Sequence, residues 1–156
     1  MILPHQKIKE FCESGIIINC AEESIRENGY DLRIDKLMVL QNGNVKELET
    51  SHDEYYSLNP NSFYLALSVE ELNMPDDVAA LMTLRSTFAR LGFLISNTVI
   101  DAGYRGKITI ALHSPPYNYM LKRGERFIHL IFFKLTEKTD KPYSGKYQGG
   151  KILPNL

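Results

Sequence analysis

The sequence predicts a mainly β domain of the sandwich or jelly-roll type, with one or two short helices. About ten short segments are rich in β-branched residues or alternate between apolar and polar residues, as strands do. Turn signals recur between these segments at the spacing of all-β folds, and the sequence contains no internal repeats. The length of 156 residues suits one domain with its own core, and 44% hydrophobic and 24% charged residues are ordinary proportions.

The N-terminal third is predicted to contain a helix, a strand and a hairpin. Residues 3–15, LPHQKIKEFCESG, suit a short helix with Pro4 in its first turn and Gly15 at its end. Residues 16–20, IIINC, are a β-branched run and predict a strand. Residues 30–49 predict two strands joined by an Asn-Gly dipeptide, which is typical of hairpin turns.

The middle of the chain contains the most ambiguous stretch. Residues 52–62 are expected to form a loop or an edge segment, and the alternating residues 63–72 predict a strand. The following AALMTLRSTFARLGF is compatible with a helix or with a buried strand. We expect a strand over residues 80–84 and then a short helix over residues 86–91 that Gly92 ends.

The C-terminal third predicts three more strands and a tail. The strands cover residues 93–101, 106–114 and 126–135, and a Lys-Arg-Gly turn precedes the last of them. The tail is rich in Gly and Pro, so residues 1–140 are expected to form one domain and residues 141–156 a flexible arm.

Charge and cysteine content exclude several kinds of partner and site. A formal net charge of -1 gives no bulk attraction to nucleic acid or anionic lipid, and neither is expected as a partner. No apolar run approaches the roughly 20 residues that span a membrane, and the N-terminus lacks the apolar core of a signal peptide. Cys12 and Cys20 lack the neighbours of a zinc site and are expected to be free thiols in a reducing cytoplasm.

Two motifs carry side chains suited to phosphate chemistry. In RSTFAR, Ser86 can open a helical turn whose free N–H groups form an anion cradle, with arginines on either side. The same pattern is compatible with a plain helix N-cap between two surface arginines. In VIDAGY, Asp101 follows an apolar strand at the start of a Gly-containing turn, where it either presents a carboxylate or only forms the turn.

Several separated blocks resemble those of one superfamily. MILPHQKIKE, NGYDLRI, LRSTFARLGF, VIDAGYRGKITI and GKYQGG match, in order and spacing, blocks of the dUTPase and dCTP deaminase superfamily. The N-terminal helix and the GKYQG tail are more similar to the dCTP deaminase branch, including its archaeal members. The resemblance implies a distorted β-barrel or jelly roll of the dUTPase-like, β-clip kind. It also implies a homotrimer with active sites between subunits.

The resemblance implies roles for individual residues. Asp101 would orient and deprotonate the water that attacks the α-phosphorus, and Tyr104 would pack beneath the deoxyribose unless it is an ordinary barrel-wall tyrosine. Asp31 matches an acid whose role varies in the family between support of the site and contact to metal-bound water. A structural role is favoured for Asp31, and Gly29 beside it would supply an unusual backbone angle. The implied substrate-binding residues are Arg85, Ser86, Thr87, Arg90, Thr98, Tyr104, His129, Lys146, Tyr147 and Gln148.

Three positions depart from the family patterns. Ala111 in GKITIAL stands where dCTP deaminases carry the glutamate that shuttles protons, and His113 is the one nearby substitute on the same strand face. His129 stands where a glutamine usually touches the triphosphate, and it is equally compatible with a position at the edge of the core. Thr98 replaces a small residue beside the base pocket. The tail lacks the Arg and Phe of the usual dUTPase lid but is expected to order over bound nucleotide.

The leading hypothesis is a Mg²⁺-dependent dUTP diphosphatase with a deoxyuridine nucleotide as substrate. A single carboxylate is sufficient to orient water for phosphate hydrolysis, whereas deamination needs a proton shuttle that a methyl group cannot supply. Mg²⁺ would be held mainly by the triphosphate and waters because no dense carboxylate cluster occurs. The alternatives are a dCTP deaminase and a non-catalytic nucleotide-binding member of the family.

Overall fold

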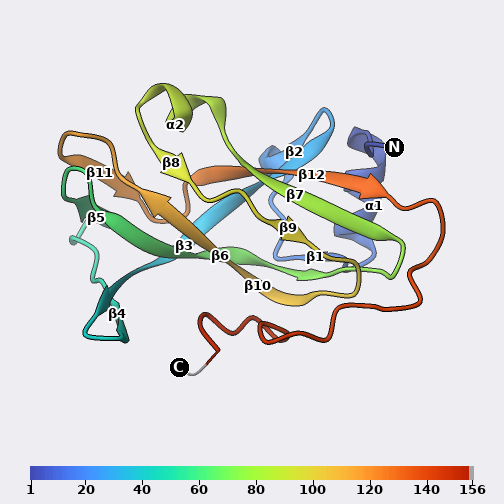
Figure 1. The fold of residues 1–156 in the computed structure, drawn as a ribbon. Coiled ribbons are helices and arrows are strands. Elements are labelled where there is room, and N and C mark those ends of the chain that lie inside the picture. Colours follow the sequence, from blue (N-terminus) through green and yellow to red (C-terminus); the bar gives the residue numbers. More distant parts are fainter. Residues whose placement is uncertain (155–156) are drawn as a thin grey trace.

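A computed structural model describes residues 1–154, and its fold confirms the predicted mainly β architecture (Figure 1). A single large sheet follows the order β8-β10-β6-β3-β12-β7-β9, and β11 pairs with β5 in a small second sheet. The elements are α1 (His5–Glu13), β1 (Ile17–Ile18), η1 (Glu22–Ser24), β2 (Ile25–Arg26), β3 (Gly29–Gln41), β4 (Asn44–Glu47), β5 (Tyr55–Leu58), β6 (Phe63–Asn73), β7 (Val78–Leu84), α2 (Ser86–Arg90), β8 (Leu94–Ile95), β9 (Val99–Ile100), β10 (Arg105–His113), β11 (Tyr119–Lys122) and β12 (Arg126–Lys134).

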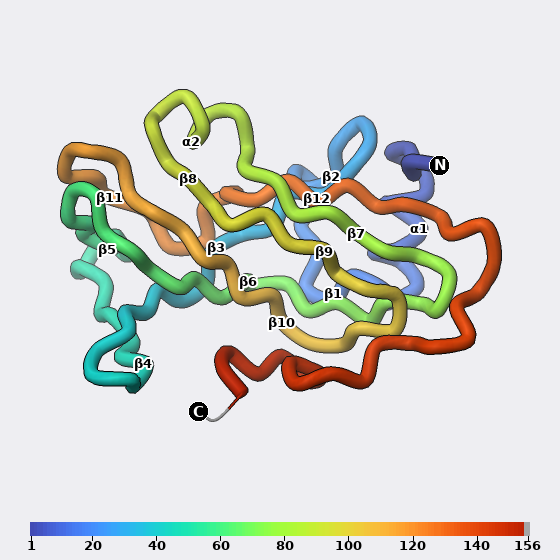
Figure 2. Tube along the Cα trace, viewed as in Figure 1, coloured from blue at the N-terminus to red at the C-terminus, as the bar shows by residue number. Residues whose placement is uncertain are grey.

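The long strand β3 causes the sheet to curl around the core. Its first residues pair with β12 and its later residues pair with β6, so β12 and β6 leave it in two different layers (Figures 1 and 2). Apolar side chains from both layers meet between them. The largest fully buried ones are Tyr30, Phe88, Phe93, Phe127, Phe132, Ile8, Ile17, Leu32, Ile34, Leu37, Leu58 and Leu72.

Most local predictions are confirmed. The N-terminal helix, the Asn-Gly hairpin between β3 and β4, and the strand followed by the short helix α2 occur at the expected places. The predicted strand over residues 16–20 is shorter and covers only β1. The segment expected to be a loop or an edge contains β5, whose partner β11 the sequence did not indicate. No helix in the described residues is long and apolar enough to cross a membrane.

The strand predicted over residues 93–101 is instead split into β8 and β9. These two short strands pair with β10 and β7, and they occupy the two ends of the sheet order. The exposed residues 96–98 cross from one end to the other, with hydrogen bonds from Ser96 N to Ala111 O at 3.0 Å and from Met82 N to Thr98 O at 3.0 Å. Residues 93–101 form two strands because the first part of the segment pairs with β10 at one end of the sheet order and the last part pairs with β7 at the other end.

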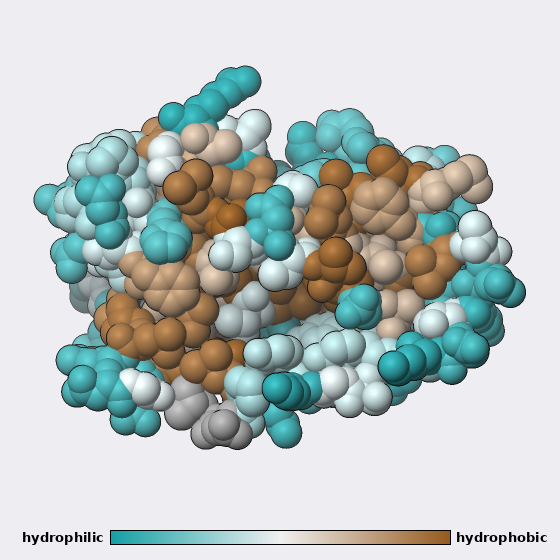
Figure 3. All heavy atoms as spheres, viewed as in Figure 1, coloured by the Kyte–Doolittle hydropathy of each residue, from teal (hydrophilic) through white to brown (hydrophobic). Residues whose placement is uncertain are grey.

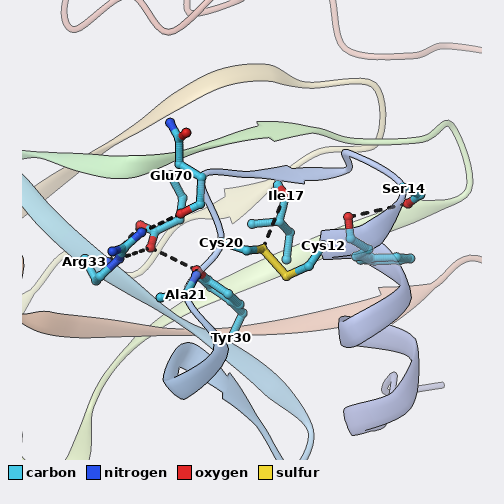
Figure 4. Close-up of a disulfide and its surroundings, with 10 residues drawn as sticks. Cys12, Ser14, Ile17, Cys20, Ala21, Tyr30, Arg33 and Glu70 are labelled. Carbon is cyan, nitrogen blue, oxygen red and sulfur yellow. Dashed lines mark hydrogen bonds and ion pairs between the residues drawn. A yellow bond between two sulfur atoms is a disulfide. The ribbon is translucent and has the colours of Figure 1, made fainter.

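The expectation of free thiols is wrong, because Cys12 and Cys20 form a disulfide (Figure 4). The chain reverses between the end of α1 and the loop after β1, which brings the two Cα atoms to 5.8 Å, within the range that a disulfide requires. Free cysteines therefore no longer support the expectation of a reducing cytoplasm.

A buried ion pair lies beside the disulfide. Glu70 is fully buried and accepts hydrogen bonds from the Tyr30 hydroxyl at 3.0 Å and from Arg33 Nε at 2.7 Å (Figure 4). Burial, together with the negative charge of Glu70, raises the pKa of Tyr30 to about 12. These contacts connect β3 to β6 next to the loop that carries Cys20.

Candidate active site

A cavity of about 470 Å³ opens where the segment between β8 and β9 crosses the sheet ends. Apolar side chains gather around this hollow in Figure 3, on the face that the C-terminal arm borders in Figure 1. Asp101 is the one carboxylate and Lys151 the one cation among the described residues that line it. The complete lining is Leu65, Met82, Ser96, Thr98, Val99, Ile100, Asp101, Tyr104, Ile108, Thr109, Ala111, Tyr143, Tyr147, Lys151 and Ile152.

Asp101 lies at the mouth of this cavity, at the first position of the turn between β9 and β10. Its backbone carbonyl accepts a hydrogen bond from Tyr104 N at 3.1 Å, which closes the turn. Its side chain is exposed. The apolar strand β9 thus ends by presenting a solvated carboxylate to a largely apolar hollow.

Tyr104 forms a wall of the cavity and is held firmly in place. Only 9% of the residue is exposed, and its hydroxyl donates a 2.6 Å hydrogen bond to the Lys107 carbonyl. The ring packs edge-on against Tyr143 with centroids 5.6 Å apart. Burial raises the pKa of Tyr104 to about 12, so the phenol stays neutral at physiological pH. It can offer a flat neutral surface to a ligand.

Strand β10 presents alternate side chains toward the cavity. Thr109 and Ala111 line it, and the Thr109 hydroxyl is buried without a hydrogen-bond partner among the described residues. The residue opposite Thr109 is Leu67, which cannot bond a hydroxyl. His113 lies farther along, is exposed, and packs against the Phe63 ring at 5.3 Å. Of these side chains, only that of His113 carries an acid–base group, and it lies outside the cavity lining.

A second cluster of predicted residues is centred on Asp31 of β3. The Asp31 side chain is 3% exposed and contacts Arg85 Nε at 3.0 Å, His129 Nδ1 at 2.9 Å and an Arg126 guanidinium nitrogen at 3.7 Å. Arg85 also donates to the Arg126 carbonyl at 2.8 Å. Asp31 therefore fixes the arginine that precedes α2.

Gly29 has a different role from the one predicted. Its φ is not in the left-handed region, so the expected unusual backbone angle is wrong. A Cβ at this position would lie 2.2 Å from the Leu130 carbonyl oxygen and 2.5 Å from His129 Nε2. Glycine is needed because β12 and the His129 ring approach the backbone here.

Helix α2 displays polar residues around one buried anchor. Phe88 is 1% exposed and packs against Phe127 at 4.5 Å between ring centroids. Ser86, Thr87 and Arg90 are exposed on the same short helix. Among the described residues, neither this helix nor the Asp31 cluster contributes to the cavity that Asp101 borders. One chain thus places the predicted phosphate-contacting and catalytic residues in two separate groups.

The C-terminal arm lies against the turn that carries Asp101. Residues 155–156, the end of the predicted arm 141–156, are outside the described residues. Tyr147 lines the cavity, Lys146 is exposed, and Gln148 bonds backbone groups of the same chain. Sequence reasoning missed Tyr143, Lys151 and Ile152 of this arm. It also missed Thr109, although strand alternation places that residue on the face of Ala111.

Comparison with known proteins identifies similar chains. Residues 2–135 match the family described as dCTP deaminase-like. The probable deoxyuridine 5′-triphosphate nucleotidohydrolase of Sulfolobus islandicus rod-shaped virus 1 is 41% identical over 97% of this chain and 95% of its own. The dCTP deaminase of Saccharolobus solfataricus is 39% identical over 100% of this chain and 92% of its own.

Solved structures share the fold at low sequence identity. The 2′-deoxycytidine 5′-triphosphate deaminase of Agrobacterium tumefaciens has a TM-score of 0.74 at 18% identity, and the match covers 84% of this chain but 47% of that chain. The EIAV dUTPase has a TM-score of 0.54 at 19% identity, with 83% and 91% covered. These similarities support the curled β architecture.

Proposed function

The chain belongs to the dCTP deaminase-like family, and we propose that within this family it is a dUTP diphosphatase that converts dUTP into dUMP and pyrophosphate. The observation that carries the proposal is the cavity lining, which contains one carboxylate, Asp101, and a methyl group at Ala111. Hydrolysis between the α- and β-phosphates needs a carboxylate to orient water and positive groups to stabilise phosphate charge.

The proposed reaction is an in-line displacement at the α-phosphorus. Asp101 accepts a proton from a water molecule while the water oxygen forms a bond to phosphorus. The bond from phosphorus to the bridging oxygen breaks, and pyrophosphate leaves with that electron pair. Tyr104 would support the deoxyribose with its neutral ring.

Mg²⁺ fits this arrangement as an ion carried by the substrate. The described residues contain no group of three or more His, Cys, Asp or Glu side chains placed to hold a metal. Mg²⁺ commonly binds through substrate phosphates, waters and one or two carboxylates, and Asp101 is the carboxylate available at the cavity. When bound, the ion would neutralise charge on the phosphate oxygens. A similarly folded dUTPase of a Staphylococcus aureus phage coordinates a structural Mg(II) ion.

A homotrimer would complete the site. Arg85 and Ser86 lie outside the cavity of their own chain, so a neighbouring copy must supply these groups if they contact the triphosphate. Arg85 has five N–H donors, and its contacts to Asp31 and to the Arg126 carbonyl leave others for phosphate oxygens. The superfamily resemblance favours three copies with sites between them.

dCTP deamination is the second candidate function. Its support is that most of the similar curated proteins carry the name dCTP deaminase. Deamination without zinc must deliver protons to the ring nitrogen and to the leaving amine. Ala111 cannot do so, and His113 packs against Phe63 instead of lining the cavity.

Product analysis tests the proposal. The purified chain is incubated with Mg²⁺ and either dUTP or dCTP, and pyrophosphate and ammonia are quantified, with Asp101→Asn as the inactive control. We expect pyrophosphate from dUTP and no ammonia from dCTP above the control. Ammonia as the main product would favour the deaminase, and binding of both nucleotides without turnover would favour a non-catalytic nucleotide-binding protein.

A further inference from the structure

The side chain of Gln148 is fully engaged with the backbone of its own chain. Its Nε2 donates to the Gly103 carbonyl and to the Tyr143 carbonyl, both at 2.9 Å, and its Oε1 accepts from Arg105 N at 2.7 Å. An amide nitrogen has two N–H donors, so both are used. The superfamily resemblance suggests that Gln148 binds substrate, but no donor of its side chain is left for a nucleotide.

Two of the three groups that Gln148 bonds, the Gly103 carbonyl and the Arg105 N–H, belong to the turn that presents Asp101, and the third, the Tyr143 carbonyl, belongs to the arm itself. Gly103 and Arg105 flank Tyr104, whose N–H bonds the Asp101 carbonyl. Two backbone hydrogen bonds support the same contact: Tyr143 N donates to Ala102 O at 2.9 Å, and Gly149 N donates to Arg105 O at 2.8 Å. The arm thus holds this turn on both sides of the cavity tyrosine.

The two glycines of the Gly-Tyr-Arg-Gly motif leave room for the arm. A Cβ at Gly106, which has a φ of +132°, would lie 2.3 Å from Gly150 N. A Cβ at Gly103 would lie 2.7 Å from Pro142 Cβ. Contacts this short do not occur in folded proteins, so any side chain at either position would push the arm away. The motif that carries the catalytic turn is therefore also shaped to receive residues 142–150.

We propose that Gln148 is a positioning residue that locks the C-terminal arm onto the Asp101–Tyr104 turn of the same chain. The locked arm sets the position of the Asp101 carboxylate and places Tyr143, Tyr147 and Lys151 in the cavity wall. The contact between the arm and the turn does not depend on which reaction the chain catalyses. The effect of this contact on turnover rests on the proposed function, because it acts through Asp101.

Amide hydrogen exchange on the nucleotide-free full chain tests the lock directly. Gln148→Met keeps a side chain of similar length and removes all three hydrogen bonds, and Gln6→Ala, an exposed site on α1, is the control. We expect the Arg105 and Gly149 amides to exchange about tenfold faster or more in Gln148→Met, the effect of losing one or two net hydrogen bonds. The Gly149 amide is informative because its partner, Arg105 O, is not altered by the substitution.

Kinetics test the effect on Asp101. With the nucleotide that the wild-type chain turns over, kcat of Gln148→Met should fall about tenfold to a hundredfold because a shift of about 1 Å at a reacting group has that effect. Gln148→Glu should behave in the same way at neutral pH, since a carboxylate cannot donate to the two carbonyls.

Two results would overturn the inference. Unchanged exchange of both amides would show that no lock exists, and weaker binding of α,β-imido-dUTP by the same variant would then make Gln148 a substrate-binding residue. Faster exchange with unchanged kcat would show that the lock does not position Asp101. If the wild-type chain releases ammonia instead of pyrophosphate, the proposed function fails. The exchange result still decides whether the lock exists.

Discussion

Replacing Asp31 by asparagine should lower the free energy of unfolding by about 3 kcal/mol. The Asp31 carboxylate is 3% exposed and serves as the shared anion for the Arg85, Arg126 and His129 side chains, at 3.0, 3.7 and 2.9 Å. Removing one partner of a buried ion pair costs about 3–5 kcal/mol because the remaining charge stays desolvated. The Arg85, Arg126 and His129 side chains are 24–29% exposed, so water can solvate them in part, which favours the lower end of this range.

Urea denaturation at neutral pH measures this loss. Wild type and Asp31→Asn are compared at one protein concentration, since assembly would make stability concentration-dependent. Asp53→Asn is the control because its side chain is 86% exposed, and it should stay within about 0.5 kcal/mol of wild type. A loss below about 1 kcal/mol in Asp31→Asn, with an unchanged m value, would show that Arg85 and Arg126 do not depend on this carboxylate.

Three further predictions concern the reaction, pH and the cavity. Asp101→Asn should lower kcat by about 10²–10⁴ with little change in dUTP-analogue affinity or melting temperature, and retained turnover would refute its role. Burial of the Asp35 carboxyl raises its pKa, but hydrogen bonds from Arg123 and Lys107 outweigh this effect, so the pKa of Asp35 is lowered overall. Its stabilisation is therefore present above the unfolded pKa of about 3.9 and lost as pH falls through the lower folded pKa. Asp35→Asn should melt below wild type at pH 7 and together with it in acid, and a difference that persists in acid would contradict this. Thr109→Val should raise stability by about 1 kcal/mol because it removes an unpaired buried hydroxyl, and calorimetry showing a loss would mean that the hydroxyl has a partner.

Local patterns were sufficient to predict most of the elements. The alternating residues of β6, the Asn-Gly hairpin and the helix that ends before Gly92 depend on backbone preferences and on periodicities that act over a few residues. Residues 93–101 also look like one strand locally. They form two because β8 and β9 pair with β10 and β7 at opposite ends of the sheet order, which no local pattern records.

The same division applies to the candidate site. The sequence singled out Asp101, Tyr104, Thr98 and Tyr147, which border one cavity, and strand alternation would have added Thr109. It could not indicate that the side-chain amide of Gln148 forms hydrogen bonds with the turn that carries Asp101, since these bonds join residues more than forty positions apart.

The sequence by itself determined the β character of the chain, the positions of most of its strands and the kinds of side chain available for phosphate chemistry, because these follow from short-range sterics and from residue identity. Only the tertiary structure decided that Cys12 bonds Cys20, that Asp31 holds Arg85, and that Arg85 and Asp101 lie in separate groups. The physical reason is that these relations depend on how distant segments pack around one core, and packing is a property of the whole chain.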